Sequence, residues 1–157
     1  MMIFAIDTCS LIALQYSGYL STIAETVDIV ITKRIHSELG EIGIFTDNDA
    51  AAAREILKLL HAITIMEVPQ RSTGEEELIE VALLKKCDFI VSDDIRAMPK
   101  LKLTNTSTLF STHLLYYLFC AGMISKEEGL IALEKMRNNR SWKENLIYIS
   151  GIQLFRW

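Results

Sequence analysis

Carboxylate side chains directly follow two apolar segments of this chain. Asp7 comes after Ile3–Ile6, and Asp93 and Asp94 come after the segment 88–92. Short, fully apolar segments of this kind are typical of buried strands in a parallel sheet. Ligands of open α/β sheets collect at the carboxyl ends of the strands, so we expect both acidic positions to open onto one edge. For Asp7 alone, an N-cap of the helix that follows is an equally good interpretation.

Further acidic residues lie where helices are expected to begin. Glu38 lies beyond a second predicted strand, 28–32, in the first turns of the next helix. Three consecutive glutamates, 75–77, lie at the start of another predicted helix, where acidic residues also favour the helix dipole. That helix is apolar nearly all round, so at least one of its glutamates is expected in a confined place. The periodicity does not select among them.

These side chains together predict a site for a hard divalent cation. Carboxylate oxygens select Mg²⁺ or Mn²⁺ rather than zinc, and His36, His61 and His113 are isolated from one another in the sequence. Such an ion would stabilise charge on a phosphate group and lower the pKa of an attacking water. The net charge of -4 argues against a protein that coats nucleic acid through a general basic surface. It does not exclude a nuclease, because a bound metal ion restores a local attraction for phosphate.

Strand and helix patterns alternate along the chain. We predict strands at 3–6, 28–32, 63–68, 88–92 and 100–103, and helices at 11–16, 19–26, 33–41, 47–60, 72–86, 107–121 and 125–138. Capping boxes are predicted at Ser72–Glu75 and Ser125–Glu128, and the apolar tail 146–155 is expected to dock on the body. This alternation predicts a three-layer α/β/α fold, in which helices cover both faces of a parallel sheet.

Length and composition set broad limits. The 157 residues, half of them apolar, suit a single domain spanning 1–157. Cys9, Cys87 and Cys120 are sparse and odd in number, which fits a reducing compartment better than a disulfide framework. No apolar run is long enough for a membrane span, and the first residues make a poor signal peptide. The expected location is cytoplasmic.

The acidic positions, taken in order, resemble those of the PIN-domain nucleases, a family of metal-dependent ribonucleases with a three-layer α/β/α fold. The resemblance covers essentially the whole chain. Its motifs are Ile6-Asp7-Thr8-Cys9-Ser10-Leu11-Ile12, then Glu38-Leu39, Gly74-Glu75-Glu76-Glu77-Leu78-Ile79 and Ile90-Val91-Ser92-Asp93-Asp94. Cys9 stands where the family usually carries serine or asparagine, and the third acid is glutamate, where aspartate is common in toxin members.

The resemblance implies a metal-dependent endoribonuclease that cleaves single-stranded or structured RNA. Its catalytic acids would be Asp7, Glu38, Glu77 and Asp94, with Asp7 and Asp94 as direct ligands of Mg²⁺ or Mn²⁺. Glu77 and Asp93 are further candidate ligands. The choice of third acid among 75–77 and the relative weight of Asp93 and Asp94 stay open. A small antitoxin protein and a second copy of the chain are implied as partners, and the apolar segment 114–120 also favours a homodimer.

Hydroxyl, amide and basic residues are candidates for contacts with substrate. Thr8 follows the first acid, and Thr104 and Asn105 follow the fifth predicted strand, where hydroxyls and helix amides could contact phosphate. An N-cap turn is the more frequent role for such a segment. Several basic residues could guide an RNA backbone, although most such charges are simply solvated. These residues are Lys33, Arg34, Lys85, Lys86, Arg96, Lys100 and Lys102.

Three other classes of function share parts of this pattern. A DNA nuclease of the flap or exonuclease type would share the acidic site, but such enzymes usually carry extra helical elements. A non-catalytic nucleic-acid-binding module with a PIN-like fold would be expected to lose the acids. A phosphotransfer or receiver-type domain would need a phosphate-accepting aspartate with a lysine on a late strand, and no convincing arrangement of that kind is found in the sequence.

Overall fold

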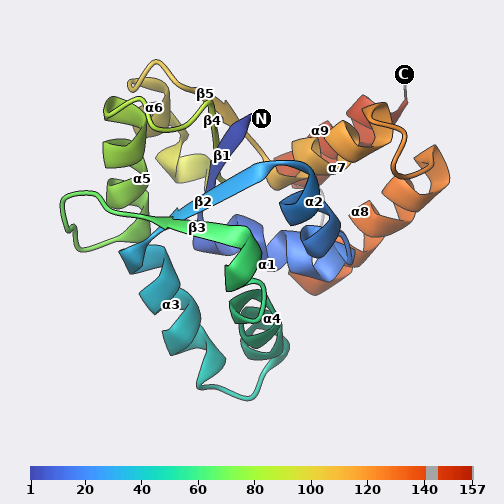
Figure 1. Ribbon diagram of the computed structural model, residues 1–157. Coiled ribbons are helices and arrows are strands. Elements are labelled where there is room, and N and C mark those ends of the chain that lie inside the picture. Colours follow the sequence, from blue (N-terminus) through green and yellow to red (C-terminus); the bar gives the residue numbers. More distant parts are fainter. Residues whose placement is uncertain (141–144, 157) are drawn as a thin grey trace.

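The computed structural model describes residues 1–140 and 145–156. Its centre is a five-stranded parallel sheet with the order β3-β2-β1-β4-β5 (Figure 1). The strands are β1 (Ile3–Ile6), β2 (Asp28–Thr32), β3 (Ile63–Met66), β4 (Phe89–Val91) and β5 (Ser107–Leu109). The carboxyl ends of all five strands therefore lie at one edge, and β1 is the central strand.

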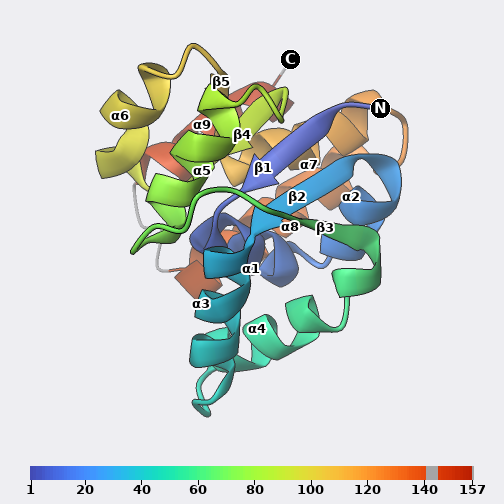
Figure 2. The same ribbon diagram turned by 60° about the vertical axis from the view of Figure 1, so that its left-hand side comes forward.

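Helices cover both faces of the sheet. They are α1 (Thr8–Ser17), α2 (Leu20–Thr26), α3 (Lys33–Gly43), α4 (Asn48–Leu57), α5 (Gly74–Leu83), α6 (Met98–Lys102), α7 (Ser111–Cys120), α8 (Lys126–Arg140) and α9 (Leu146–Phe155), with short 3₁₀ turns η1 (Leu60–Ala62) and η2 (Ile95–Ala97). The sheet separates α5 and α6 from α1, α2 and α7 to α9, and Figure 2 brings α5 and α6 forward (Figures 1 and 2). The predicted three-layer α/β/α fold is confirmed.

One connected apolar core joins the layers. Phe4, Ala5 and Ile6 of β1 are at most 2% exposed, as expected for a central strand covered on both faces. The same cluster of buried side chains reaches Ile147 and Phe155, so the tail docks on the body as predicted. Within the described ranges, no helix has the length and apolar character required to cross a bilayer.

The predicted fifth strand at 100–103 is wrong, because this segment forms α6 and the turn after it. Pro99 lies in the first turn of α6, where proline favours a helix, and Leu101 is buried while Leu103 is 82% exposed. Asn105 then adopts a left-handed φ of 58° in the turn that leads to β5. The next helix consequently begins at Ser111, because the residues from Ser107 to Leu109 pair with β4.

Smaller differences concern where elements begin and end. β3 ends at Met66 rather than at Val68, and α4 ends at Leu57 rather than at Leu60. The N-cap of α5 is Thr73, one residue later than predicted, and its Oγ1 accepts a hydrogen bond from the amide of Glu76 at 3.2 Å. The box between Ser125 and Glu128 is confirmed by reciprocal hydrogen bonds of 2.7 and 3.0 Å.

Candidate functional site

Asp7 lies at the end of β1 and caps α1. Its Oδ1 accepts a hydrogen bond from the amide of Ser10 at 2.8 Å, and its Oδ2 accepts one from the Ser92 hydroxyl at 2.6 Å. Burial raises the pKa of the Asp7 carboxyl, the hydrogen bonds from Ser10 and Ser92 oppose that rise, and the nearby charge of Asp94 adds to it. Asp7 is thus an N-cap and also an ionisable group in an unfavourable electrostatic position.

Ser92 connects the ends of the two central strands. Its side chain is buried, donates to Asp7, and accepts a hydrogen bond from the amide of Asp94 at 3.2 Å. The Asp7 amide in turn donates to the carbonyl of Val91 at 3.1 Å, which extends the pairing of β1 with β4. The relative position of Asp7 and Asp94 is therefore fixed through both backbone and side chain.

The two aspartates after β4 have different surroundings. Asp94 is the N-cap of η2, where its Oδ1 accepts from the Arg96 amide at 3.0 Å, and its side chain is 37% exposed. Both oxygens of Asp93 bind Ser111, at the start of α7, through its amide at 2.8 Å and its hydroxyl at 2.6 Å. Burial, together with the charge of Asp7, raises the pKa of Asp93 to about 7 despite these hydrogen bonds. Asp93 thus joins β4 to α7, while Asp94 faces the cavity described below.

The Glu38 carboxylate of α3 accepts hydrogen bonds from the first residues of two other helices, α1 and α5. Its Oε2 accepts from the Thr8 hydroxyl at 2.5 Å, and its Oε1 accepts from the amide of Gly74 at 2.9 Å. A Cβ atom at position 74 would lie 2.8 Å from Cγ1 of Ile35 and 3.0 Å from Oε2 of Glu38, so glycine is required for this close approach. The carboxylate is 27% exposed. It is therefore positioned by its neighbours and still open to solvent.

The glutamates of α5 separate into two roles. Glu77, predicted as the third acid, is 2% exposed, and its carboxylate accepts from the amides of Arg34 and Arg71, each at 3.0 Å. Burial raises its pKa, but these bonds and one from Thr32 outweigh burial, so the pKa is lowered overall. Glu75 is the glutamate of this segment that lines the acidic cavity, together with Glu38. The structure thus places Glu77 away from the other predicted acids.

A cavity of about 180 Å³ lies at the carboxyl edge of the sheet. Its lining residues are Asp7, Thr8, Cys9, Glu38, Thr73, Gly74, Glu75, Leu78, Ser92, Asp94, Ala97 and Leu101. We call this the acidic cavity. It brings together Asp7, Glu38 and Asp94, as the sequence predicted, from β1, α3 and the end of β4. In the described part of the chain, however, no three carboxylate, imidazole or thiol groups lie close enough to hold a metal ion in these side-chain positions.

Cys9 lies at this cavity beside Asp7. Part of the residue reaches solvent, yet partial desolvation by its surroundings and the nearby Asp7 charge raise the pKa of the thiol to about 11. The thiol is therefore protonated at neutral pH. A protonated thiol is a poor nucleophile, so the chemistry of the cavity comes from its oxygen atoms.

Thr104 and Asn105 lie apart from the acidic cavity. They precede β5 rather than follow a strand, which places them at the amino-terminal edge of the sheet, opposite Asp7. The Thr104 hydroxyl donates to the carbonyl of Leu101 at 2.6 Å and accepts from the Thr106 amide at 3.3 Å. This segment is a local turn. Thr8 does line the cavity, but its hydroxyl is bound to Glu38.

Sequence reasoning missed two contributors. Ser92 and Gly74 lie within the motifs that carry the acidic residues, but the sequence alone predicts no role for either residue. A serine between a buried strand and two aspartates, and a glycine at the first position of a helix, are the available signals. Neither pattern alone indicates which group the residue contacts. Comparison of the chain with protein-family models and with curated proteins finds no match.

Proposed function

We propose that this chain is a metal-dependent ribonuclease whose reaction takes place at the acidic cavity. The observation that carries the proposal is that four carboxylates, Asp7, Glu38, Glu75 and Asp94, line one cavity from four separate parts of the chain. Lysine, arginine and histidine are missing from the described lining. Burial, with a smaller contribution from the charge of Asp94, raises the pKa of Asp7, and a cation would favour the ionised carboxylate.

The donor set fits a hard divalent ion. All four carboxylates and the hydroxyls of Thr8 and Ser92 offer oxygen, the ligand preferred by Mg²⁺ and Mn²⁺. Asp7, Asp94, Glu38 and Glu75 are the residues that would hold the ion. Because no three of these groups lie close enough to do so in this structure, their side chains would have to move together around it. When bound, such an ion supplies charge stabilisation on a phosphate group and lowers the pKa of a coordinated water.

Other residues of the chain orient the carboxylates of the acidic cavity. Ser92 and the Ser10 amide orient Asp7, while Thr8 and the Gly74 amide orient Glu38. Among the described residues, no hydrogen bond or ion pair engages the carboxylate of Glu75. An unengaged carboxylate at the cavity is suited to orient the attacking water and receive its proton. We assign this role to Glu75 in place of Glu77.

Two further parts of the proposal, the RNA substrate and a small antitoxin partner, rest on the resemblance described above. The homodimer rests on that resemblance and on the apolar segment 114–120, and the cytoplasmic location rests on the sparse cysteines and the other sequence features given for it above. A phosphodiester substrate suits the chemistry of the cavity.

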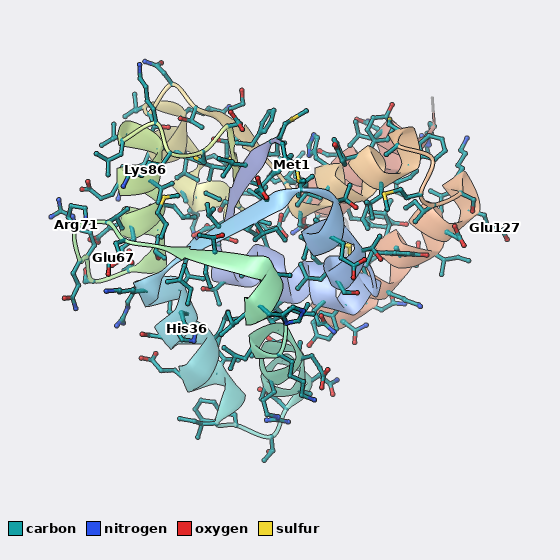
Figure 3. The ribbon with its side chains drawn as sticks, in the orientation of Figure 1. Met1, His36, Glu67, Arg71, Lys86 and Glu127 are labelled. Atoms are coloured by element: carbon teal, nitrogen blue, oxygen red, sulfur yellow. The ribbon has the colours of Figure 1, made fainter. Side chains whose placement is uncertain are left out.

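The test is a cleavage assay with end-labelled single-stranded RNA and DNA of the same sequence. Titration of Mg²⁺ and Mn²⁺ should start cleavage of the RNA, and excess chelator should stop it. Asp7→Asn and Glu75→Gln should each lower kcat by roughly 100-fold or more, as expected for removal of a metal ligand or general base. Glu127→Gln, which removes an exposed carboxylate from α8 (Figure 3), is the matched control and should be fully active.

Four results would contradict the proposal. Cleavage that persists in excess chelator would exclude a metal-dependent reaction. Full activity of Asp7→Asn would place the chemistry elsewhere. RNA binding without cleavage under any divalent ion would favour the non-catalytic module, and preferential cleavage of DNA would favour the DNA nuclease.

A further inference from the structure

A second cavity, of about 340 Å³, is lined by residues of α3, of α5 and of the segment between β3 and α5. Its lining residues are Lys33, Arg34, Ser37, Val68, Gln70 and Glu77. The loop between Glu67 and Arg71, both labelled in Figure 3, contributes Val68 and Gln70, and α3, which carries the labelled His36, contributes the basic side (Figure 3). We call this the basic cavity.

The Arg34 side chain has a buried donor that nothing in the described residues satisfies. Its Nε atom is shielded from solvent and makes no hydrogen bond, and the nearest carboxylate oxygen, Oε1 of Glu38, is 4.0 Å away. That distance is too long for a hydrogen bond, and an unsatisfied buried donor is unfavourable. The side chain as a whole is 38% exposed, so a ligand can reach the guanidinium. An oxygen acceptor in this cavity would meet the exposed part of the guanidinium first and would satisfy Nε once the side chain turns toward it.

The hydrogen-bond donors around the cavity suit an anion as that acceptor. The Glu77 carboxylate keeps its negative charge, because its pKa is lowered, but both of its oxygens are occupied by hydrogen bonds from the amides of Arg34 and Arg71. Lys33 pairs with Glu67 at 2.7 Å, but both side chains are largely exposed, and exposed pairs of this kind contribute little and open easily. A guanidinium with a nearby ammonium, a hydroxyl and an amide is a donor set that suits the oxygens of a phosphate group.

The two cavities border the same helix. α3 presents Glu38 to the acidic cavity, and Arg34 and Ser37 to the basic cavity. Arg34 and Glu38 are one turn apart on α3, and Nε of Arg34 lies 4.0 Å from Oε1 of Glu38, so the two cavities adjoin along this helix. A nucleic-acid strand with one phosphate at the acidic cavity can therefore present another to Arg34.

We infer that the basic cavity is a phosphate-binding subsite for the nucleic-acid strand held at the acidic cavity, with the Arg34 guanidinium as its central donor. The inference rests on the proposed function for the identity of the strand. It also accounts for how a chain of net charge -4 attracts a polyanion next to a set of carboxylates, because the attraction is local.

The test measures binding of a fluorescent single-stranded oligouridine by anisotropy in excess chelator, which separates binding from cleavage. Arg34→Met keeps the aliphatic part of the side chain and removes its charge. It should raise the Kd by about tenfold and lower the slope of log K against log salt by about 0.7, the value for one phosphate contact on a single strand. Arg34→Lys, which keeps the charge but loses the planar fork, should fall between Arg34→Met and the wild type.

Lys58→Met is the matched control. Lys58 is an exposed lysine of an ion pair, with Glu55 at 2.8 Å, and lies just after α4. Its removal changes the net charge as much as Arg34→Met does, and it should leave both the Kd and the salt slope unchanged. Melting temperatures of all variants show whether they are folded. With Mg²⁺ present, Arg34→Met should raise KM more than it lowers kcat.

The outcomes separate this inference from the proposed function. Wild-type binding by Arg34→Met, in a protein that cleaves RNA, overturns the subsite and leaves the nuclease intact. Binding that depends on Arg34, without any cleavage, supports the phosphate-binding subsite and contradicts the proposed nuclease activity. Calorimetric titration of the same variants with inorganic phosphate tests whether the basic cavity binds free phosphate instead of a nucleic-acid phosphate. If phosphate binds through Arg34 and the oligonucleotide does not, the assignment to a nucleic-acid strand is overturned.

Discussion

Asp7 combines a structural role and a candidate catalytic role in one side chain. Its two oxygens bind Ser10 and Ser92, yet burial and Asp94 raise its pKa, so its negative charge is unfavourable in the metal-free protein. An asparagine can still accept from the Ser10 amide and can face the Ser92 hydroxyl with its NH₂ group. The variant therefore keeps the N-cap hydrogen bond and loses the negative charge.

Asp7→Asn should therefore leave the metal-free protein at least as stable as the wild type, because it removes a partly buried charge that its surroundings disfavour. Mg²⁺ should stabilise the wild type, by about 2.7 kcal/mol at one hundred times its Kd, and should stabilise the variant much less. Thermal unfolding of both proteins, with Mg²⁺ and with chelator, measures the four values. A variant that gains as much from Mg²⁺ as the wild type would remove Asp7 from the metal site.

The contrast between Glu75 and Glu77 provides a second prediction. Glu77→Gln replaces an oxygen that accepts from a backbone amide with an NH₂ group, and should lower the free energy of unfolding by about 1.5–3 kcal/mol, the range for hydrogen bonds to a charged group. Glu75→Gln should leave stability within about 0.5 kcal/mol and lower kcat by the roughly 100-fold or more given above. Urea unfolding and the cleavage assay together make the comparison. The opposite pattern would restore Glu77 as the third acid.

Asp93 should make the free energy of unfolding fall as the pH rises, whereas an ion-paired acid with a lowered pKa makes it rise. Its folded pKa of about 7 lies above the ordinary value of 3.8, so the folded state binds its proton more tightly than the unfolded state does. Its contribution is therefore neutral below about pH 4 and becomes increasingly destabilising as the pH rises to about 7. Subtracting the unfolding free energies of Asp93→Asn from those of the wild type, in chelator, isolates this slope. A flat difference between pH 4 and 8 would contradict it.

At the scale of elements, the site depends on the close approach of α5 to α3. Gly74→Ala would place a methyl group 2.8 Å from Ile35 and 3.0 Å from the Glu38 carboxylate. We expect a loss of stability of about 1–3 kcal/mol and a displaced Glu38, with lower activity. Gly40→Ala, in the middle of α3 with no atom within 4 Å of the new Cβ, should instead stabilise the protein by about 0.5–1 kcal/mol. Chemical unfolding and cleavage assays of the pair distinguish local crowding from a general effect of glycine.

The elements show which parts of this arrangement could be predicted from sequence. The first two strands were predicted with their observed bounds, and Asp7 and Asp94 were predicted at one edge, because an apolar run that ends in an aspartate is a local pattern. The secondary structure predicted between Lys100 and Leu109 was wrong, because alternating Lys and Leu residues suit a short helix as well as a strand. The choice between Glu75 and Glu77 depends on how α5 is rotated against α3, which local periodicity does not specify.

At the scale of the whole molecule, the three layers meet around the sheet, and the candidate site lies where the sheet's carboxyl edge meets α1, α3 and α5. Acids from both halves of the chain contribute, since Asp7 and Glu38 precede β3 while Glu75 and Asp94 follow it. Neither half contains the complete cavity.

The central position of β1 also affects how the site is lost. The Asp7 amide is bound to Val91 inside the sheet, with β2 and β3 on one side and β4 and β5 on the other. Hydrogen exchange at such an amide requires opening of the cooperative unit, so its protection factor should report the global free energy of unfolding. The Arg96 amide, bound to the half-exposed Asp94 in η2, should exchange through local fraying and much faster. Mass-spectrometric exchange that resolves these two amides would then distinguish loosening of the cavity rim from loss of the entire fold.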